Sequence, residues 1–100
     1  MLTDIIIAHY GTGHLTDLCL QCLESIRLHS ADYRMIFVDN ASPEFSSLES
    51  ELEWHPHKLI RNTSNLGFVK AVNLGLMMST APYVVLMNND TRAVVFAWKI

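Results

Sequence analysis

The segment Tyr83–Thr91, which reads YVVLMNNDT, decides the fold of this chain. Residues 83–87 form an apolar run rich in β-branched side chains, which is typical of a strand buried on both faces of a parallel sheet. Asn88, Asn89 and Asp90 follow at once. Ligands of open α/β sheets bind beyond the carboxyl ends of the strands, so these oxygens would suit a hard cation bound to a diphosphate. The alternative is a plain polar turn, because the same residue types favour turns.

Outward from this segment, the chain alternates between strand-like and helix-like patterns. Short runs rich in β-branched residues predict strands, and apolar residues at intervals of three and four predict helices. In chain order these segments are Asp4–Ala8 (strand), Leu15–Ile26 (helix), Tyr33–Asp39 (strand), Glu44–Trp54 (short helix), Lys58–Arg61 (edge-like strand) and Leu66–Leu76 (helix). With 83–87 as the last strand, this order predicts an α/β fold, a Rossmann-like sheet of four mostly parallel strands flanked by helices.

The composition excludes several classes of protein. The chain has 100 residues, 50% of them hydrophobic and 17% charged, so residues 1–100 can bury a core as a single domain. A net charge of −3 provides no basic surface for nucleic acid. No apolar run reaches the roughly 20 residues of a transmembrane helix, and we expect neither a transmembrane segment nor a signal peptide. Two cysteines are too few for a disulfide scaffold, which favours the cytoplasm.

The last residues, Ala93–Ile100, are largely apolar but show neither a turn nor a helix cap. A sheet that ended with the strand at 83–87 would leave that strand at an edge unless these residues covered it. We therefore expect the chain to be the truncated N-terminal part of a larger domain.

Polar residues stand at the ends of three predicted strands. His9 and Tyr10 follow the first, Asp39 and Asn40 close the second, and Asn88–Asp90 follows the fourth. Because the carboxyl ends of parallel strands meet at one edge of a sheet, these side chains should converge. Tyr10 can stack on a base, and Asp39 can accept hydrogen bonds from a ribose hydroxyl or a base N–H. Each group alone could be a turn, but their convergence predicts a nucleotide site.

Three motifs, in this order, carry a resemblance to a known family. They are VDNAS at 38–42, NLGFVKAVNLGL at 65–76 and YVVLMNNDT at 83–91. Together they resemble the family 2 glycosyltransferases, which have the GT-A fold and include rhamnosyltransferase-like enzymes. The resemblance covers nearly the whole chain up to Thr91 and implies that residues 1–100 are the N-terminal, donor-binding part of a GT-A domain.

The resemblance implies donor-binding roles for named residues. Asp39 matches an aspartate that contacts the nucleotide, and His9 and Tyr10 match a Thr-Tyr pair, with His9 in place of the threonine. Lys70 could supply a charge near Val72, which stands where many members carry a polar or basic residue. The implied nucleotide-sugar-binding residues are His9, Tyr10, Asp39, Asn65, Gly67, Lys70 and Asn88.

Asn88–Asp90 matches the family's Asp-x-Asp motif, which binds the ribose and, through the diphosphate, a divalent metal. The resemblance therefore implies Mn²⁺ or Mg²⁺ as the cofactor, with Asp90 and Asn88 as ligands. Asn88 replaces the first aspartate, as in the Asn-x-Asp-Thr of one branch of the family. Asp90 is then the one carboxylate ligand, and a weaker metal affinity is expected.

The activity implied by the resemblance is transfer of a sugar, with inversion, from a nucleotide-diphosphate sugar to an acceptor hydroxyl. The acceptor is expected to be a glycan or a lipid-linked molecule in cell-wall or polysaccharide biosynthesis. The expected place is the cytoplasm, including the inner face of the membrane as a peripheral protein. The catalytic base is expected beyond Ile100, in the family's second half. A truncated or degenerate domain that binds a nucleotide sugar without catalysis is the alternative.

Two shorter motifs allow other interpretations. Residues 11–16, GTGHLT, follow a strand, open a helix and precede Asp39, as in an NAD(P)-binding Rossmann domain, but the last residue is threonine instead of glycine. Cys19 and Cys22 could form a zinc or redox motif, yet both lie on the apolar face of the predicted helix, so we expect buried core thiols. His55–His57 is expected to be a solvated loop and not a metal pair.

Overall fold

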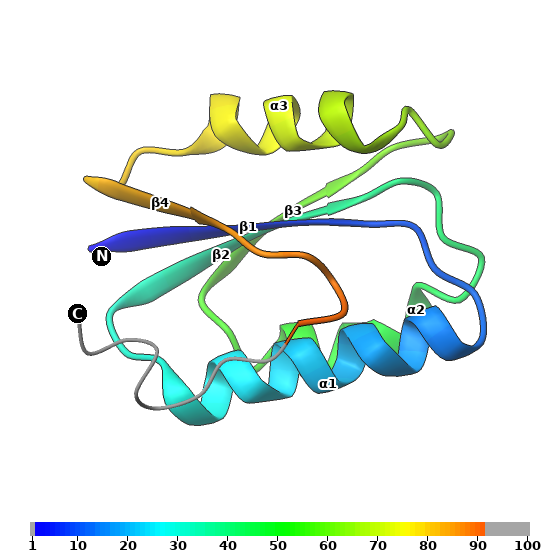
Figure 1. The fold of residues 1–100 in the computed structure, drawn as a ribbon, viewed down its shortest axis with the longest axis horizontal. Helices are drawn as coiled ribbons and strands as arrows, with labels where there is room; N and C mark the ends of the chain where they lie inside the picture. The colour runs from blue at the N-terminus through cyan, green and yellow to red at the C-terminus, as the bar shows by residue number, and fades with distance from the viewer. Residues whose placement is uncertain (1, 92–100) are drawn as a thin grey trace.

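The computed structural model describes residues 2–91, which form one parallel sheet with helices on both faces (Figure 1). In chain order the elements are β1 (Thr3–His9), α1 (His14–His29), β2 (Tyr33–Asp39), α2 (Ser46–Leu52), β3 (His57–Arg61), α3 (Phe68–Met78) and β4 (Tyr83–Leu86). Neighbouring strands follow the order β3-β2-β1-β4, and all three pairs are parallel. The predicted fold class is confirmed. Within the described residues, no helix is both long enough and apolar enough to cross a membrane.

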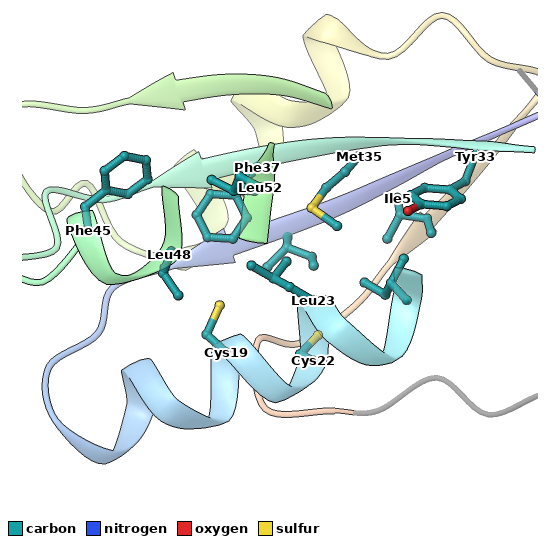
Figure 2. Packing of buried hydrophobic residues seen from close by; sticks show 12 residues of the cluster. Ile5, Cys19, Cys22, Leu23, Tyr33, Met35, Phe37, Phe45, Leu48 and Leu52 are labelled. Carbon is teal, nitrogen blue, oxygen red and sulfur yellow. The ribbon is translucent and has the colours of Figure 1, made fainter. Parts of the chain in front are cut away.

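The larger part of the core lies between the sheet and the α1 and α2 layer. Alternate side chains of β1 and β2 point into this layer and meet the apolar faces of both helices, as Figure 2 shows. Cys19 and Cys22 are fully buried there and form no disulfide, which confirms their interpretation as core thiols. The buried residues of this cluster are Ile5, Ile7, Cys19, Cys22, Leu23, Ile26, Tyr33, Met35, Phe37, Phe45, Leu48 and Leu52.

Helix α3 covers the opposite face through small residues. Ala71 is fully buried, and a Cβ atom added to Gly75 would lie 2.7 Å from Cγ2 of Ile6, so the helix backbone approaches β1 closely. Val72 packs against the same buried cluster and is half-buried, whereas Val69 and Leu76 do not share this contact, because they are 70% and 47% exposed.

Strand β4 corrects one prediction, since it is not buried on both faces. Among the described residues its one neighbour is β1, and Tyr83 and Leu86 are 63% and 49% exposed. Strands β1 and β2 each lie between two others and are buried, so an apolar run does not distinguish a central strand from an edge strand. Strand β3 lies at the opposite edge, as predicted. The apolar segment Ala93–Ile100 lies outside the described residues.

Asp4, fully buried in β1, joins three parts of the chain at the amino-terminal end of the sheet. Its Oδ1 accepts a hydrogen bond from Arg34 Nε at 3.0 Å, and its Oδ2 accepts one from Arg34 Nη2 at 3.1 Å. The Ser79 hydroxyl and the N–H groups of Thr80 and Ala81 also donate to Oδ2, at 2.8, 2.9 and 3.0 Å. Burial alone would raise the pKa of Asp4, but these donors together hold it well below its usual range.

His55 corrects a second prediction, because it is buried and not part of a solvated loop. Its Nδ1 lies 2.7 Å from the Tyr33 hydroxyl and its Nε2 lies 3.0 Å from Glu51 Oε2, which also pairs with Arg27 Nε at 2.9 Å. Burial lowers the pKa of His55, and the Glu51 carboxylate raises it only in part. Its neighbour His57 is exposed at the start of β3. These bonds connect α1, α2 and β2 at the end of the sheet remote from the strand carboxyl ends.

Candidate functional site

A pocket of about 360 Å³ opens at the carboxyl-terminal edge of the sheet. It lies where β1 and β2 end, between the loop that leads into α3 and the turn that follows β4. In open parallel sheets, ligands bind at this edge. The residues that line the pocket are Ala8, His9, Tyr10, Asn40, Asn65, Gly67, Phe68, Asn88, Asn89 and Asp90.

The pocket brings together most of the residues that the sequence singled out. Those in its lining are His9, Tyr10, Asn65, Gly67, Asn88 and Asp90. Two others do not line it: Lys70 is exposed in the first turn of α3, and Asp39 is fully buried. The three strand ends converge as expected, with β2 contributing Asn40 instead of Asp39.

Asp39 lies beneath the edge of the sheet, on the side of α1 and α2. Its Oδ2 accepts a hydrogen bond from the Ser42 N–H at 3.0 Å and lies 3.6 Å from Arg61 Nε. The guanidinium carbon of Arg61 lies 4.1 Å from the ring centre of Phe45, which holds this cation over an aromatic face. The other oxygen, Oδ1, is buried and has no hydrogen-bond partner among residues 2–91. The carboxylate therefore retains an unused acceptor close to the pocket.

His9 occupies the register position beside Asp39, and its side chain is only 1% exposed. Its Nδ1 is hydrogen-bonded to the side-chain amide of Asn89 at 2.7 Å, and its Nε2 has no partner among the described residues. Burial lowers the pKa of His9, while the nearby Asp39 carboxylate raises it in part. The neutral imidazole is therefore favoured, with one ring nitrogen engaged by the turn that follows β4.

Asn40 organises the loop that leads into α3. Its Nδ2 donates to the carbonyl of Gly67 at 3.2 Å, and its Oδ1 accepts from the Asn62 side chain at 2.8 Å. Asn65 Oδ1 in turn accepts from the Gly67 N–H at 2.9 Å. Gly67 has a φ of 86°, which favours glycine because its missing Cβ removes the steric penalty of that region. These bonds fix the wall of the pocket that Asn65 and Gly67 form.

The start of α1 is closed by the side chain of Glu44. Its Oε1 accepts hydrogen bonds from the Gly13 N–H at 2.5 Å and from the Thr16 hydroxyl at 2.9 Å. In a dinucleotide-binding fold the pyrophosphate lies at this helix end, bound by free N–H groups. In this chain the carboxylate of Glu44 occupies the start of α1 instead. The Gly11 N–H is also engaged, by Ser42 Oγ at 3.0 Å, so the geometry does not support the NAD(P) interpretation.

The turn after β4, residues 88–91, presents two oxygen-bearing side chains. The N–H and the hydroxyl of Thr91 both donate to the Asn88 carbonyl, at 3.2 and 2.8 Å, and this closes the turn. The Cys22 thiol lies 3.7 Å from the same carbonyl, and burial raises the pKa of this thiol to about 11, so it is protonated and can donate at neutral pH. The side chains of Asn88 and Asp90 are exposed and have no hydrogen-bond partner among residues 2–91.

The sequence pattern of glycosyl transferase family 2 matches residues 4–93, nearly the whole chain. The chain belongs to this family. The resemblance seen in the three motifs is thereby confirmed, and no curated protein matches the chain by sequence.

Solved glycosyltransferase structures share the fold of this family 2 chain. TarS 1-349 of S. aureus matches it with a TM-score of 0.84 and 17% identity, over 99% of this chain and 30% of TarS. TarS 1-349 in complex with UDP-GlcNAc gives 0.84 and 17%, over 99% and 29%. The mannosyltransferase PcManGT of Pyrobaculum calidifontis, in complex with GDP-Man and Mn²⁺, gives 0.76 and 24%, over 88% and 27%. At such identities the likeness shows the GT-A fold, and this chain spans less than a third of each of these structures.

Two residues that shape this family 2 site, Glu44 and Gly11, were not site candidates from the sequence. Asn40 and Asn89 belong to the strand ends that were predicted to converge, and they line the pocket and make the bonds described above. Glu44 closes the start of α1 from a distant loop, which no local pattern indicates. Gly11 was noticed only for the NAD(P) motif, but a Cβ atom there would lie 2.3 Å from Cε1 of His9. The glycine is needed because the backbone passes directly over the imidazole.

Proposed function

We propose that this chain forms the donor-binding part of a glycosyltransferase that transfers a sugar from a nucleotide-diphosphate sugar to an acceptor hydroxyl. The observation that supports this most is the pocket at the strand ends, which gathers Tyr10, Asn65 and Asp90 within a family 2 fold. Structures with the same fold were solved with UDP-GlcNAc and with GDP-Man and Mn²⁺. A donor of this chemistry, a nucleoside joined to a sugar by a diphosphate, suits the mixture of polar groups in the pocket.

In this proposal the nucleoside lies beside Tyr10, whose side chain is 44% exposed and offers a ring face for stacking on the base. Asn65 forms the facing wall. Asp39 provides Oδ1, a buried acceptor without a partner among residues 2–91, which a ribose hydroxyl or base N–H would satisfy. Lys70, exposed at the start of α3, would supply positive charge for the diphosphate.

The residues at the turn fit a divalent cation that is held mainly by the diphosphate. Within residues 2–91 no group of three or more His, Cys, Asp or Glu side chains could hold a metal by itself. Asp90 and Asn88 nevertheless offer a carboxylate and an amide oxygen, both exposed at the pocket. Mg²⁺ is usually bound by one or two carboxylates together with substrate phosphates, and the two donors match that pattern. When bound, Mn²⁺ or Mg²⁺ would neutralise charge on the leaving diphosphate.

The described residues are proposed to bind and orient the donor, and we assign the base that deprotonates the acceptor to another part of the protein. The acceptor is proposed to be a glycan or lipid-linked molecule of a cell-wall or polysaccharide pathway. We place the reaction in the cytoplasm or at the inner membrane face, because two unpaired thiols suit a reducing compartment. The chain by itself is then expected to bind the donor without transferring the sugar.

The test is a calorimetric titration of the chain with UDP-GlcNAc and with GDP-mannose, each with and without Mn²⁺. Asp90→Ala should weaken the Mn²⁺-dependent binding by about tenfold or more and leave the metal-free binding unchanged. Asp39→Asn should weaken binding under both conditions. Glu24→Ala, which removes an exposed carboxylate on α1 outside the pocket, is the matched control and should change neither.

Two results would contradict the proposal. Unaltered Mn²⁺-dependent affinity in Asp90→Ala would remove the metal role from that residue. If the folded wild-type chain bound neither nucleotide sugar, donor binding itself would have to be abandoned.

A further inference from the structure

The turn that carries Asn88 and Asp90 has left the sheet. The last backbone hydrogen bond between β1 and the chain after β4 runs from the Met87 N–H to the Ile6 carbonyl at 3.0 Å. Among residues 2–91, no backbone bond joins residues 88–91 to β1. The exposed oxygens of the turn therefore depend on side-chain contacts for their place at the rim.

The side chain of His9 makes such a contact. Its Nδ1 lies 2.7 Å from Nδ2 of Asn89, which is 80 residues away in the sequence. Asn89 is half-buried, whereas its neighbours Asn88 and Asp90 are exposed, so the middle residue of the turn faces β1 and the outer two face the pocket opening. The bond spans the gap where β1 and the chain after β4 diverge.

The imidazole of His9 is itself held in one place. Its ring centre lies 5.8 Å from that of Phe37, and its side chain is 1% exposed. A Cβ atom on Gly11 would lie 2.3 Å from Cε1 and 2.5 Å from Nε2 of the ring. The backbone above, the aromatic ring beside it and Asn89 at Nδ1 together leave the ring little freedom, and its burial leaves almost no surface for a ligand.

We propose that His9 is a positioning residue: through Nδ1 it holds Asn89, and so fixes the Asn88 and Asp90 side chains at the pocket. The identity of the ligand rests on the proposed function. The bond between His9 and Asn89 and its effect on the turn at 88–91 rest on the geometry alone. The resemblance implied direct donor binding by His9, whereas the geometry gives this residue an indirect role. Because the bond to Asn89 is made by Nδ1, the role can be tested by replacing His9 with asparagine or with glutamine, whose side-chain amides reach different ring positions.

The experiment compares two replacements of the imidazole. The side-chain amide of asparagine ends near the position of Nδ1, and that of glutamine ends near the position of Nε2. His9→Asn should keep the bond to Asn89 and retain the Mn²⁺-dependent affinity for UDP-GlcNAc or GDP-mannose. His9→Gln should lose about three- to tenfold of that affinity, the value of one hydrogen bond, without loss of metal-free affinity. Asn89→Ala changes the other partner of the bond, at a half-buried site, and should show the same loss. It provides the test if a change at the buried His9 prevents folding.

A second readout needs no ligand. Hydrogen exchange at the Thr91 amide, which is bonded to the Asn88 carbonyl, should speed up about three- to tenfold in His9→Gln and in Asn89→Ala but not in His9→Asn. If the wild-type chain binds no nucleotide sugar while this exchange pattern is found, the proposed function fails and the positioning role stands. Equal exchange rates in His9→Asn and His9→Gln, or an unchanged rate in Asn89→Ala, would overturn the positioning role.

Discussion

Replacement of Asp4 by alanine should destabilise the fold strongly, although the residue is remote from the pocket. Five hydrogen bonds end on this carboxylate, two from Arg34 and one each from Ser79, Thr80 and Ala81. Removal of one partner from a buried ion pair costs about 3–5 kcal/mol. Arg34 remains 16% exposed and keeps its bond to the Thr80 hydroxyl, so we expect the lower end, about 3 kcal/mol.

The assay is urea unfolding followed by far-UV circular dichroism. Asp4→Asn serves as the graded variant, since an amide oxygen can still accept from the Ser79 to Ala81 segment while the charge opposite Arg34 is lost. It should fall between the wild type and Asp4→Ala. Glu24→Ala, which removes an exposed carboxylate, should stay within about 0.5 kcal/mol of the wild type.

The same carboxylate predicts a dependence of stability on pH. The pKa of Asp4 is depressed in the folded state, so its contribution is complete above the unfolded value near pH 4 and is lost as the pH falls through the range below it. Asp4→Ala should therefore lose less stability than the wild type on acidification. The assigned role of Asp4 would be refuted if Asp4→Ala lost less than about 1 kcal/mol of unfolding free energy at neutral pH. It would also be refuted if the stability of this variant fell as steeply with acidification as that of the wild type.

Two further predictions follow from the packing and the buried histidine. Gly75→Ala should lower the free energy of unfolding by about 1–3 kcal/mol, because the added methyl group would collide with Ile6. Met77→Ala, at an 81% exposed site on the same helix, is the control and should change this free energy by less than about 0.5 kcal/mol. Burial lowers the pKa of His55 in the folded state, so the imidazole is protonated at a higher pH in the unfolded chain. The stability of the fold should therefore fall as the pH drops below about 6.5. His55→Gln should flatten this fall in unfolding titrations between about pH 7 and pH 5, and an equal effect of His29→Gln, at an exposed site, would contradict it.

Much of the fold could be predicted because burial leaves a mark on local sequence. Strands β1 and β2 lie under helices on both faces, so nearly every position is buried and the central positions form plain apolar runs. The apolar run of β4 has the same appearance, yet Tyr83 and Leu86 face solvent among the described residues. Strand order depends on pairings between distant segments, which no periodicity within one segment encodes.

The candidate site could be predicted to the level of the sheet edge but not to the level of each side chain. His9 and Asp39 share a face with Phe37, toward α1 and α2, whereas Tyr10 and Asn40 follow the face that packs on α3 and opens on the pocket. Successive side chains of a strand point to opposite faces of the sheet. This alternation favours Asn40 over Asp39 as a residue that lines the pocket. The bond between His9 and Asn89 depends on the path of two loops and could not be derived from spacing.

The position of β1 between β2 and β4 also has a consequence for the kinetics of folding. The first strand of the chain pairs with the last described strand, and Asp4 is bonded to groups 75 to 77 residues away. During synthesis, β1 can pair with β2 early, but its other edge must wait until the segment at 83–86 has left the ribosome. Folding that depends on such distant pairings is slow, because the entropy of closing a long loop is lost before any contact is gained. For that interval the polar backbone edge of β1 is open to pairing with other chains, so the step most exposed to aggregation is the docking of β4.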